Sequence, residues 1–197
     1  MVGVDRTLKG LDELPEDIRR EPGDATDPAV AKSVIDRIAA AVGPPEVLVN
    51  TIGAFRLGEV AAATPEDLRV MMDVNLGAAL WLSQAAAPYM RERGSGAIVH
   101  VSARPGTDPT AGLVAYSLSK AALSHLVRVL DLELRPHGIR VNAVAPQLLD
   151  TAANRAAFPP DLLKQAVQPE AIAGIIAFLV SDAAAPVSGA IVPAYGG

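Results

Sequence analysis

Tyr116 and Lys120 are the two side chains of this sequence whose types and spacing are best suited to proton transfer. They lie four residues apart at the start of a predicted helix, so they share one helix face and the ammonium group can approach the phenol. A nearby positive charge favours the phenolate and lowers a phenol pKa that is otherwise about 10. The spacing therefore predicts that Tyr116 acts as a general acid or base near neutral pH, the alternative being a helix end with a solvated lysine.

Short apolar runs alternate with longer helical patterns along the chain, and these elements would position such a pair. The predicted strands span residues 2–4, 18–21, 47–49, 97–101, 139–144 and 190–194, and the predicted helices span 28–42, 64–93, 113–134 and 169–181. Apolar strands that alternate with helices indicate an α/β fold, in which helices cover both faces of a doubly wound parallel sheet. The sequence contains no repeat and no linker, so residues 1–197 form one predicted domain.

Ligands bind such sheets beyond the carboxyl ends of the strands, so the residues after each predicted strand are candidates for a site. Asn50–Thr51–Ile52–Gly53 closes the third strand, and a small residue such as Gly53 lets a cofactor approach the backbone. Asp5 ends the first strand, where an acid can bind a pair of ribose hydroxyls. Asn75 lies within the second predicted helix although asparagine is a poor helix former, so it needs a reason, of which exposure to solvent is the simplest.

The composition excludes several classes of function. The 197 residues carry a formal net charge of -5, so no basic surplus is available to neutralise the phosphates of a nucleic acid. The chain has no cysteine, which excludes disulfides, zinc–thiolate sites and thiol catalysis, and its three histidines lack a metal-like spacing. It shows neither a signal peptide nor an apolar stretch of the ~20 residues that a membrane helix needs. We therefore expect a cytoplasmic protein that acts on a small molecule, without nucleic acid, membrane or metal.

Five motifs, in order and at matching spacing, make the chain similar to the short-chain dehydrogenase/reductase family from Val2 to Gly197. They are Asn50–Thr51–Ile52–Gly53, Asp73–Val74–Asn75–Leu76, Tyr116–Ser117–Leu118–Ser119–Lys120, Val141–Asn142–Ala143–Val144–Ala145–Pro146 and Ser188–Gly189–Ala190. The resemblance implies a Rossmann-like fold, a nicotinamide cofactor, and hydride transfer between the nicotinamide and a carbonyl or alcohol.

The resemblance also implies roles for individual residues. Tyr116 would donate the proton, Lys120 would tune its pKa and bind the ribose, and Asn75 would hold a water in a proton relay. Thr151 would contact the nicotinamide carboxamide, and Asp24 would approach the adenine. The full set of residues expected to bind the cofactor is Asp5, Asp24, Asn50, Gly53, Tyr116, Lys120, Pro146 and Thr151.

The choice and the presence of a cofactor depend on the first residues of the chain. Asp5 favours NAD(H) over NADP(H), because a carboxylate repels a 2′-phosphate, although Arg6 beside it acts the other way. In the family, a strand and a helix precede the position of Val2 and carry a glycine-rich turn that cradles the pyrophosphate. No such turn occurs here, since Gly94–Ser95–Gly96 precedes a predicted strand. We therefore expect a truncated domain that leaves two strand edges open or paired differently, with a cofactor-free protein as the alternative.

Two further departures concern the catalytic serine and a glycine. The family serine lies thirteen residues before the tyrosine, a position that Ala103 occupies here, with Ser102 one residue earlier. Ser102 is the catalytic serine if the loop carries a one-residue insertion; the ungapped alignment keeps Gly106 in place and directs Ser102 to the opposite side of the strand. Gln147 stands where the family usually has glycine after Pro146.

These two departures make the chain similar to the dihydropteridine-reductase-like branch of the family, whose reductases also have alanine at the serine position. The segment Leu149–Asp150–Thr151–Ala152–Ala153–Asn154–Arg155, followed by Phe158–Pro159, is similar to the corresponding segment of that branch. An imine-type quinonoid substrate needs less oxyanion stabilisation than a ketone, which is consistent with Ala103.

We therefore predict an NAD(P)-dependent oxidoreductase that acts on a carbonyl, an alcohol or a dihydropteridine-like substrate, with Tyr116 as general acid or base. The alternative is a non-catalytic, cofactor-free relative that serves as an interaction or assembly subunit, and a third reading is a hetero-oligomer in which another chain supplies the missing strand. In the family, the helices matching 64–93 and 113–134 often form subunit interfaces, so the resemblance also implies a homodimer or homotetramer.

Overall fold

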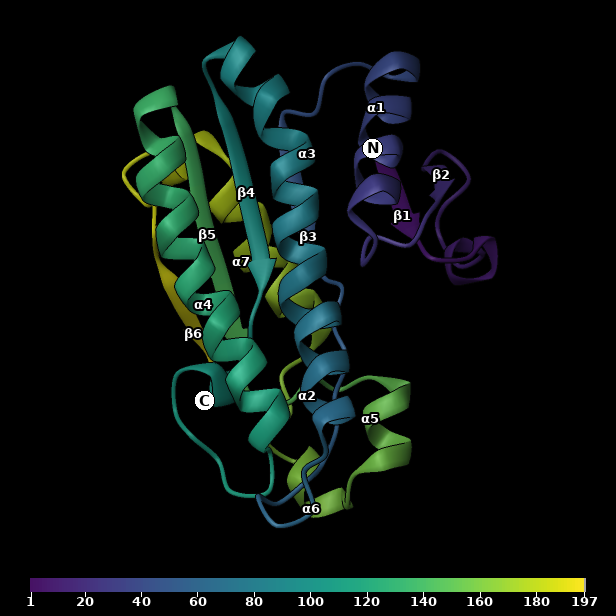
Figure 1. Ribbon diagram of the computed structural model, residues 1–197, viewed down its shortest axis with the longest axis vertical. Helices are drawn as coiled ribbons and strands as arrows, with labels where there is room; N and C mark the ends of the chain where they lie inside the picture. The colour runs from purple at the N-terminus through teal and green to yellow at the C-terminus, as the bar shows by residue number, and fades with distance from the viewer. Residues whose placement is uncertain (197) are drawn as a thin grey trace.

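Six parallel strands form two sheets in the computed structural model, which describes residues 1–196 (Figure 1). The first sheet pairs β1 (Val2–Asp5) with β2 (Arg19–Pro22), and the second has the order β3 (Val47–Asn50), β4 (Gly96–Val101), β5 (Ile139–Pro146) and β6 (Ile191–Ala194). All four pairings are parallel, which confirms the predicted α/β fold. Gly197, the last residue of the predicted domain, lies outside the described residues.

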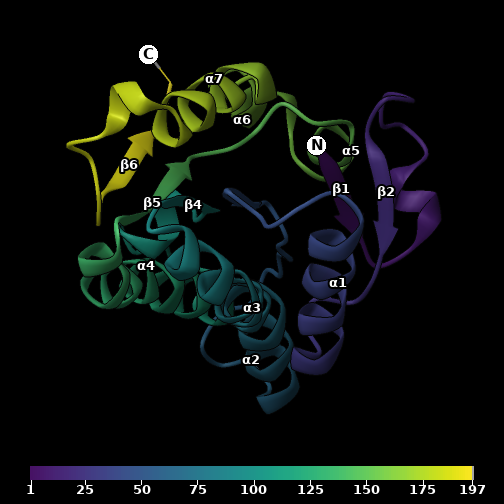
Figure 2. The ribbon, with the colours of Figure 1, turned by 90° about the horizontal axis from the view of Figure 1, so that it is seen from above.

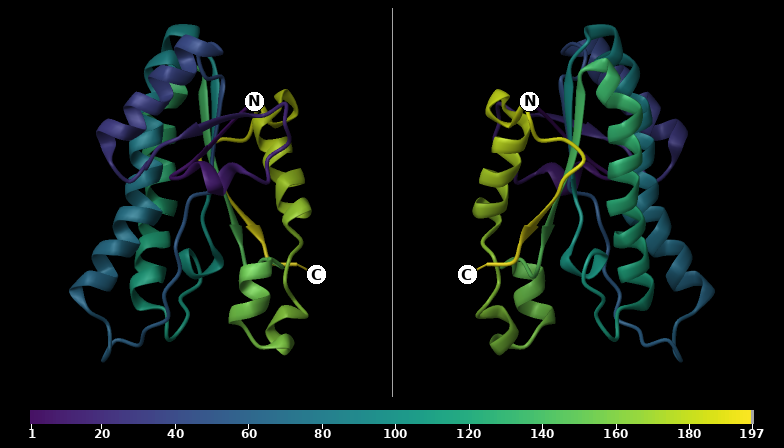
Figure 3. Two further views of the ribbon diagram at one scale, coloured as in Figure 1. Left: turned by 90° about the vertical axis from the view of Figure 1, so that its right-hand side faces the viewer. Right: turned by 90° about the vertical axis from the view of Figure 1, so that its left-hand side faces the viewer.

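Helices cover both faces of the four-stranded sheet, as Figures 2 and 3 show. The helices on one side are α1 (Pro28–Ala41), α2 (Pro65–Met72), α3 (Ala78–Arg93) and α4 (Val114–Leu134), and those on the other are α5 (Ala152–Ala157), α6 (Pro160–Leu163) and α7 (Pro169–Val180). The two layers bury both faces of β4, so that Ile98 and Val99, which point to opposite faces, are both fully buried. The predicted layering is thus confirmed.

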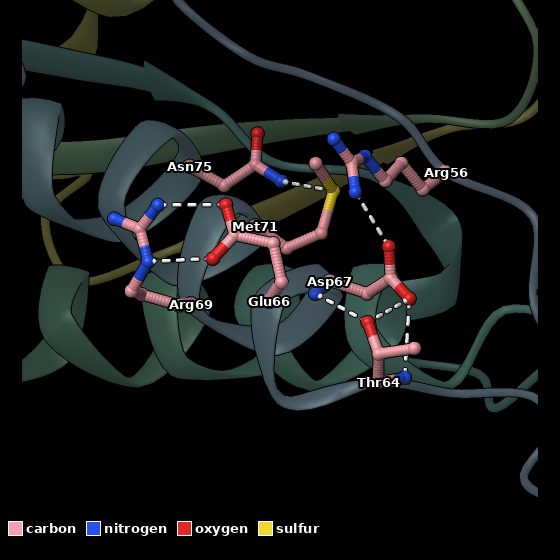
Figure 4. A network of polar contacts seen from close by, with 7 residues as sticks. All are labelled: Arg56, Thr64, Glu66, Asp67, Arg69, Met71 and Asn75. Atoms are coloured by element: carbon pink, nitrogen blue, oxygen red, sulfur yellow. Dashed lines mark hydrogen bonds and ion pairs between the residues drawn. The ribbon is translucent and has the colours of Figure 1, made fainter.

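Local signals explain where the helices begin. The Asp27 side chain accepts hydrogen bonds from the first turn of α1, and Pro28 follows at the first helical position. Thr64 and Asp67 form a reciprocal capping box at the start of α2, shown in Figure 4. The predicted helix over 64–93 is correct in extent but is interrupted by a π-helical turn, η2 (Asp73–Gly77), between α2 and α3.

The two sheets are not joined to each other. Within residues 1–196, no strand pairs with the outer edge of β1 or of β3, so of the two expected outcomes, open edges or different pairing, the structure shows open edges. Val47 and Val49 of β3 are accordingly 44% and 41% exposed, unusually high values for an apolar strand in a parallel sheet. The β1–β2 unit is connected to the rest of the fold through α1, which packs along α3.

None of the described helices combines the length and the hydropathy that a bilayer crossing requires.

Candidate active site

A cavity of about 370 Å³ lies at the carboxyl ends of β3, β4 and β5, the edge of the sheet where the sequence predicts a ligand. Its lining includes Ser102, Ala103, Tyr116, Lys120, Pro146 and Gln147. A second cavity of about 490 Å³ lies near the amino ends of the same strands and contains none of the predicted site residues. The first cavity is therefore the candidate active site.

Tyr116 lies in the first turn of α4, where its ring meets that of Phe55 edge-on at a centroid distance of 4.9 Å. Its hydroxyl makes no hydrogen bond to any described residue, which leaves it available to a ligand. Burial raises the pKa of Tyr116 to about 12, because the phenolate loses its hydration there. The predicted lowering of this pKa is therefore wrong for the protein alone, and the phenol is protonated at neutral pH.

Lys120 follows one turn later on the same helix and is 4% exposed. Its Nζ donates a hydrogen bond to the carbonyl oxygen of Val101, at the end of β4, over 2.9 Å. Burial lowers the pKa of Lys120 to about 8, because the ammonium is poorly hydrated. In the protein alone the ammonium donates to the strand, and the burial of the phenol, not the nearby charge, sets the direction of the Tyr116 pKa shift.

Asn75 occupies the π-helical turn η2 and is fully buried. Its Oδ1 accepts the backbone N–H of Ala54 at 2.8 Å, and its Nδ2 donates to the carbonyl of the same residue at 3.0 Å. Nδ2 also donates to Ser119 Oγ at 2.9 Å and points toward Met71 Sδ in Figure 4. Asn75 therefore ties the segment after β3 to α4 between Tyr116 and Lys120. A local π turn is a common device at functional sites.

Gly53 leaves the space in which these groups meet. A Cβ at this position would lie 3.1 Å from Asn75 Oδ1 and 3.3 Å from Lys120 Nζ, closer than most real Cβ contacts. The absence of a side chain at Gly53 therefore lets Asn75 and Lys120 lie against this backbone, and the approach of a ligand there stays a prediction.

Asn50 lies immediately before this turn and is 3% exposed. Its Oδ1 accepts the N–H of Ile52 at 3.0 Å, and its Nδ2 lies 3.4 Å from Nδ1 of the fully buried His100. His100 also contacts Ser83, and burial lowers its pKa to about 4, so the imidazole is neutral. His100 is thus a core residue of β4.

Ser102 lines the cavity, but its hydroxyl is engaged with α4. It lies 2.8 Å from Ser124 Oγ and donates to the carbonyl of Lys120 at 3.3 Å. The next residue, Ala103, has an extended backbone and is 3% exposed. Because successive side chains of an extended chain alternate in direction, Ala103 faces the opposite side from Ser102.

Ser102→Ala is expected to change kcat/KM by less than about threefold, because the hydroxyl is already used within the protein. Loss of its hydrogen bond to Ser124 should lower the free energy of unfolding by about 1 kcal/mol. Steady-state kinetics and denaturant unfolding measure the two effects. A drop in kcat/KM above ~100-fold, about 2.7 kcal/mol, would instead assign the catalytic serine to Ser102.

The remaining predicted cofactor residues do not line the cavity. The Thr151 hydroxyl caps α5 by accepting the N–H of Asn154 at 3.2 Å. Asp5 ends β1 and accepts the N–H of Thr7 at 2.9 Å, and Asp24 follows β2 and accepts from Thr26. These hydrogen bonds hold the pKa of Asp24 below its usual value. The structure thus brings together Tyr116, Lys120, Ser102 and Pro146, with Asn75, Gly53 and Asn50 behind them.

Sequence reasoning missed the aromatic wall of the cavity. Phe55 lies between Tyr116 and Phe158, at centroid distances of 4.9 and 5.6 Å. Phe55 lies in an irregular segment and Phe158 directly follows the short helix α5, and neither segment carries a periodic signal. With Leu57, Leu113 and Leu149 they make the lining largely apolar.

The reactive end of a nicotinamide dinucleotide fits this arrangement. Lys120 offers a cation and Tyr116 a free hydroxyl on the lining of the cavity. Pro146 continues the same edge of the sheet at the end of β5. The sequence contains no Gly-x-Gly-x-x-Gly turn, so the residues present do not define a cradle for the pyrophosphate.

The arrangement of sheets and helices defines the class of protein first. The chain superposes with a TM-score of 0.91 on a gluconate 5-dehydrogenase from Burkholderia cenocepacia, crystallised with NADP and tartrate. The two are 27% identical, and the match covers all of this chain and 84% of the other. The fold is therefore the Rossmann-like fold of nicotinamide-dependent oxidoreductases.

Sequence comparison then defines the family. Residues 4–197 match the family described as enoyl-(acyl carrier protein) reductase. A galactitol 2-dehydrogenase from Rhizobium johnstonii is 38% identical over 189 residues, 89% of this chain and 74% of the relative. A 4-formylbenzenesulfonate dehydrogenase from Comamonas testosteroni is 33% identical, over 88% of this chain and 75% of the relative. The chain belongs to the short-chain dehydrogenase/reductase family of oxidoreductases.

Proposed function

We propose that this protein transfers a hydride between a nicotinamide cofactor and a carbonyl, alcohol or dihydropteridine-like substrate, with Tyr116 as general acid or base. The observation that carries the proposal is the free Tyr116 hydroxyl, protonated at neutral pH, on the wall of a cavity that also contains Lys120. Perturbed acids that line a cavity are typical of catalytic sites.

The cofactor supplies the hydride when it is bound. Tyr116 donates its proton to the substrate oxygen or nitrogen as the hydride arrives. Lys120, with a pKa of about 8, is largely protonated at pH 7 and stabilises the phenolate that remains. Asn75 keeps the segment after β3 in place through its two hydrogen bonds to Ala54. These residues hold the proton donor and the charge that replaces it.

The cavity favours a substrate with an apolar or aromatic body. Phe55 and Phe158 form an aromatic wall, and the polar groups are few. A planar ring with one carbonyl or imine group fits both the lining and the available volume of about 370 Å³. The name of the relative from Comamonas testosteroni, an aromatic aldehyde dehydrogenase, supports the same class.

We also propose that the protein forms a homodimer or homotetramer through α2–α3 and α4. These helices expose large apolar side chains, among them Leu68 of α2 at 43% and Leu118 and Leu132 of α4 at 53% and 72%. Apolar groups gathered on helices of this kind favour association with a second copy.

Calorimetric titration of the 197-residue protein with NADH and NADPH tests the cofactor. NADH is expected to bind with a Kd below about 100 μM and more tightly than NADPH, because the Asp5 carboxylate at the end of β1 repels a 2′-phosphate. Asp5→Asn should reduce the preference for NADH by removing the charge.

Asp12→Asn, at an exposed position, is the matched control and should leave both affinities unchanged. Folded protein that binds neither nucleotide would contradict the proposal and favour the cofactor-free alternative. Tighter binding of NADPH than of NADH would contradict only the role assigned to Asp5 and would leave the rest of the proposal intact.

A further inference from the structure

We propose that the Gln147 side chain binds the substrate oxygen through its Nε2 group and supplies the hydrogen-bond donor that Ala103 lacks. The inference deepens the proposed function, on which it rests. It assigns to Gln147 the recognition of a carbonyl group in the cavity beside Tyr116, with Arg104 as the residue that orients its carboxamide.

The first argument is position. Residues Val101 of β4 and Val144 of β5 are paired in the parallel register. The same register continued by two residues brings Ala103 beside Pro146, one residue before Gln147. Both Ala103 and Gln147 line the cavity that contains Tyr116. A donor on Gln147 can therefore reach the region that a serine at position 103 would serve.

The second argument is the orientation of the carboxamide. Arg104 Nη1 donates a hydrogen bond to Gln147 Oε1 over 2.9 Å. A guanidinium has donors and no acceptor, so chemistry requires that the amide oxygen faces it and that the NH₂ group points away. Nε2 makes no hydrogen bond to any residue of the described range 1–196. Among the described residues the buried side-chain polar atom without a partner is Ser117 Oγ, so Nε2 of Gln147 is accessible and can donate to a ligand in the cavity.

The third argument is that Arg104 is itself held in place. Its Nε donates to Asp108 Oδ2 at 3.3 Å, and its guanidinium lies 4.8 Å from the centre of the Tyr195 ring. The Tyr195 hydroxyl is in turn 3.0 Å from Thr107 Oγ1. The contacts with Asp108 and Tyr195 thus fix the guanidinium of Arg104, so that the carboxamide of Gln147 is oriented before substrate arrives.

Other polar groups of the lining are less suited to this role. The Ser102 hydroxyl is engaged with Ser124, and Asn154 Nδ2 donates to the carbonyl of Leu149 at 2.8 Å. Thr51 and Thr110 lie at exposed positions. Apart from Tyr116 and Lys120, Gln147 therefore carries the half-buried donor of the lining that is free for a ligand.

Gln147→Met tests the assignment, because methionine has a similar length and no donor. The variant is expected to lower kcat/KM about 100-fold for reduction of benzaldehyde or acetophenone, the loss typical of one oxyanion donor, with the Kd of NADH unchanged. Ala103→Ser in the Gln147→Met background should raise kcat/KM again by at least tenfold, because the serine hydroxyl then faces the same region of the cavity. Gln84→Met, at an exposed position of α3, is the control and should be neutral.

Arg104→Met should lower kcat/KM about tenfold alone and have no further effect in the Gln147→Met background. A purely structural role of Arg104 would lower the rate equally in both backgrounds, so the double-mutant cycle identifies it as a positioning residue.

Benzamide, an unreactive carbonyl compound, measures the same contact without turnover. Its Kd, determined by calorimetry, is expected to rise about tenfold in Gln147→Met and to recover with Ala103→Ser. Equal affinity of wild type and Gln147→Met, or no binding to either, would overturn the inference. Benzamide binding that depends on Gln147, in a protein that turns over no carbonyl, alcohol or dihydropteridine with NADH or NADPH, would support the inference and refute the proposed function.

Discussion

Tyr116→Phe is expected to lower nicotinamide-dependent turnover by about 10³-fold while leaving the fold intact. The change removes one hydroxyl, which makes no hydrogen bond to any described residue, and it keeps the ring that packs against Phe55. The free energy of unfolding should therefore stay within about 0.5 kcal/mol of the wild-type value. Loss of rate without loss of stability is the signature of a proton donor.

Absorbance at 340 nm and denaturant unfolding measure the two quantities on the same preparations. Tyr89→Phe is the matched control, because it also removes a phenolic hydroxyl, one that donates to Asp36 at 3.0 Å on the far side of α3. It should cost a little stability and leave turnover unchanged. Turnover in Tyr116→Phe that equals the wild type would remove Tyr116 from the mechanism.

The Tyr116 pKa of about 12 also predicts how the rate of reduction responds to pH. A buried phenol stays protonated throughout the range in which the protein can be assayed, so reduction should show no loss of rate from Tyr116 ionisation between about pH 6 and pH 9.

The sequence-based prediction of a lowered Tyr116 pKa was wrong for an identifiable reason. Spacing along a helix shows that Lys120 is near, but burial by Phe55 and other distant residues depends on the folded chain.

The sequence alone located the strands, their parallel arrangement and the edge of the sheet that carries the cavity, because these follow from apolar runs and from the carboxyl-end rule. It also singled out Asn75 as an unusual helix residue, and the structure places it in a π turn. By contrast, the orientation of Gln147 requires Arg104, which is 43 residues away, and no local pattern encodes that hydrogen bond.

Thr151 illustrates a different limit of sequence reasoning. The resemblance implies a contact with the nicotinamide, but the hydroxyl caps α5, a helix of six residues that no periodicity predicts. The capping hydroxyl accepts one hydrogen bond and keeps its own proton to donate, so the cap does not test the cofactor contact and the role of Thr151 stays a prediction. The same holds for Asp5, whose carboxylate accepts a hydrogen bond from Thr7 within the β1–β2 unit.

Lys120→Met is expected to abolish turnover and to make the protein more stable. A pKa of about 8 in place of 10.5 corresponds to a cost of about 3 kcal/mol for holding the ammonium charge in the fold at pH 7. Methionine removes that cost and keeps much of the apolar stem. It also leaves the carbonyl of Val101 without its donor, a loss of about 1 kcal/mol. We therefore expect a net gain of about 2 kcal/mol in the free energy of unfolding at pH 7.

The pH dependence distinguishes this cause from better packing. Between about pH 8 and pH 10.5 the unfolded chain binds more protons at this lysine than the folded chain, so the contribution of Lys120 to stability rises with pH in that window. The advantage of Lys120→Met should accordingly shrink as the pH approaches 10.5. Urea unfolding at pH 7, 9 and 10.5 measures it, with Lys9→Met, at an exposed position, as the control. A variant that is less stable at pH 7 would contradict the burial cost.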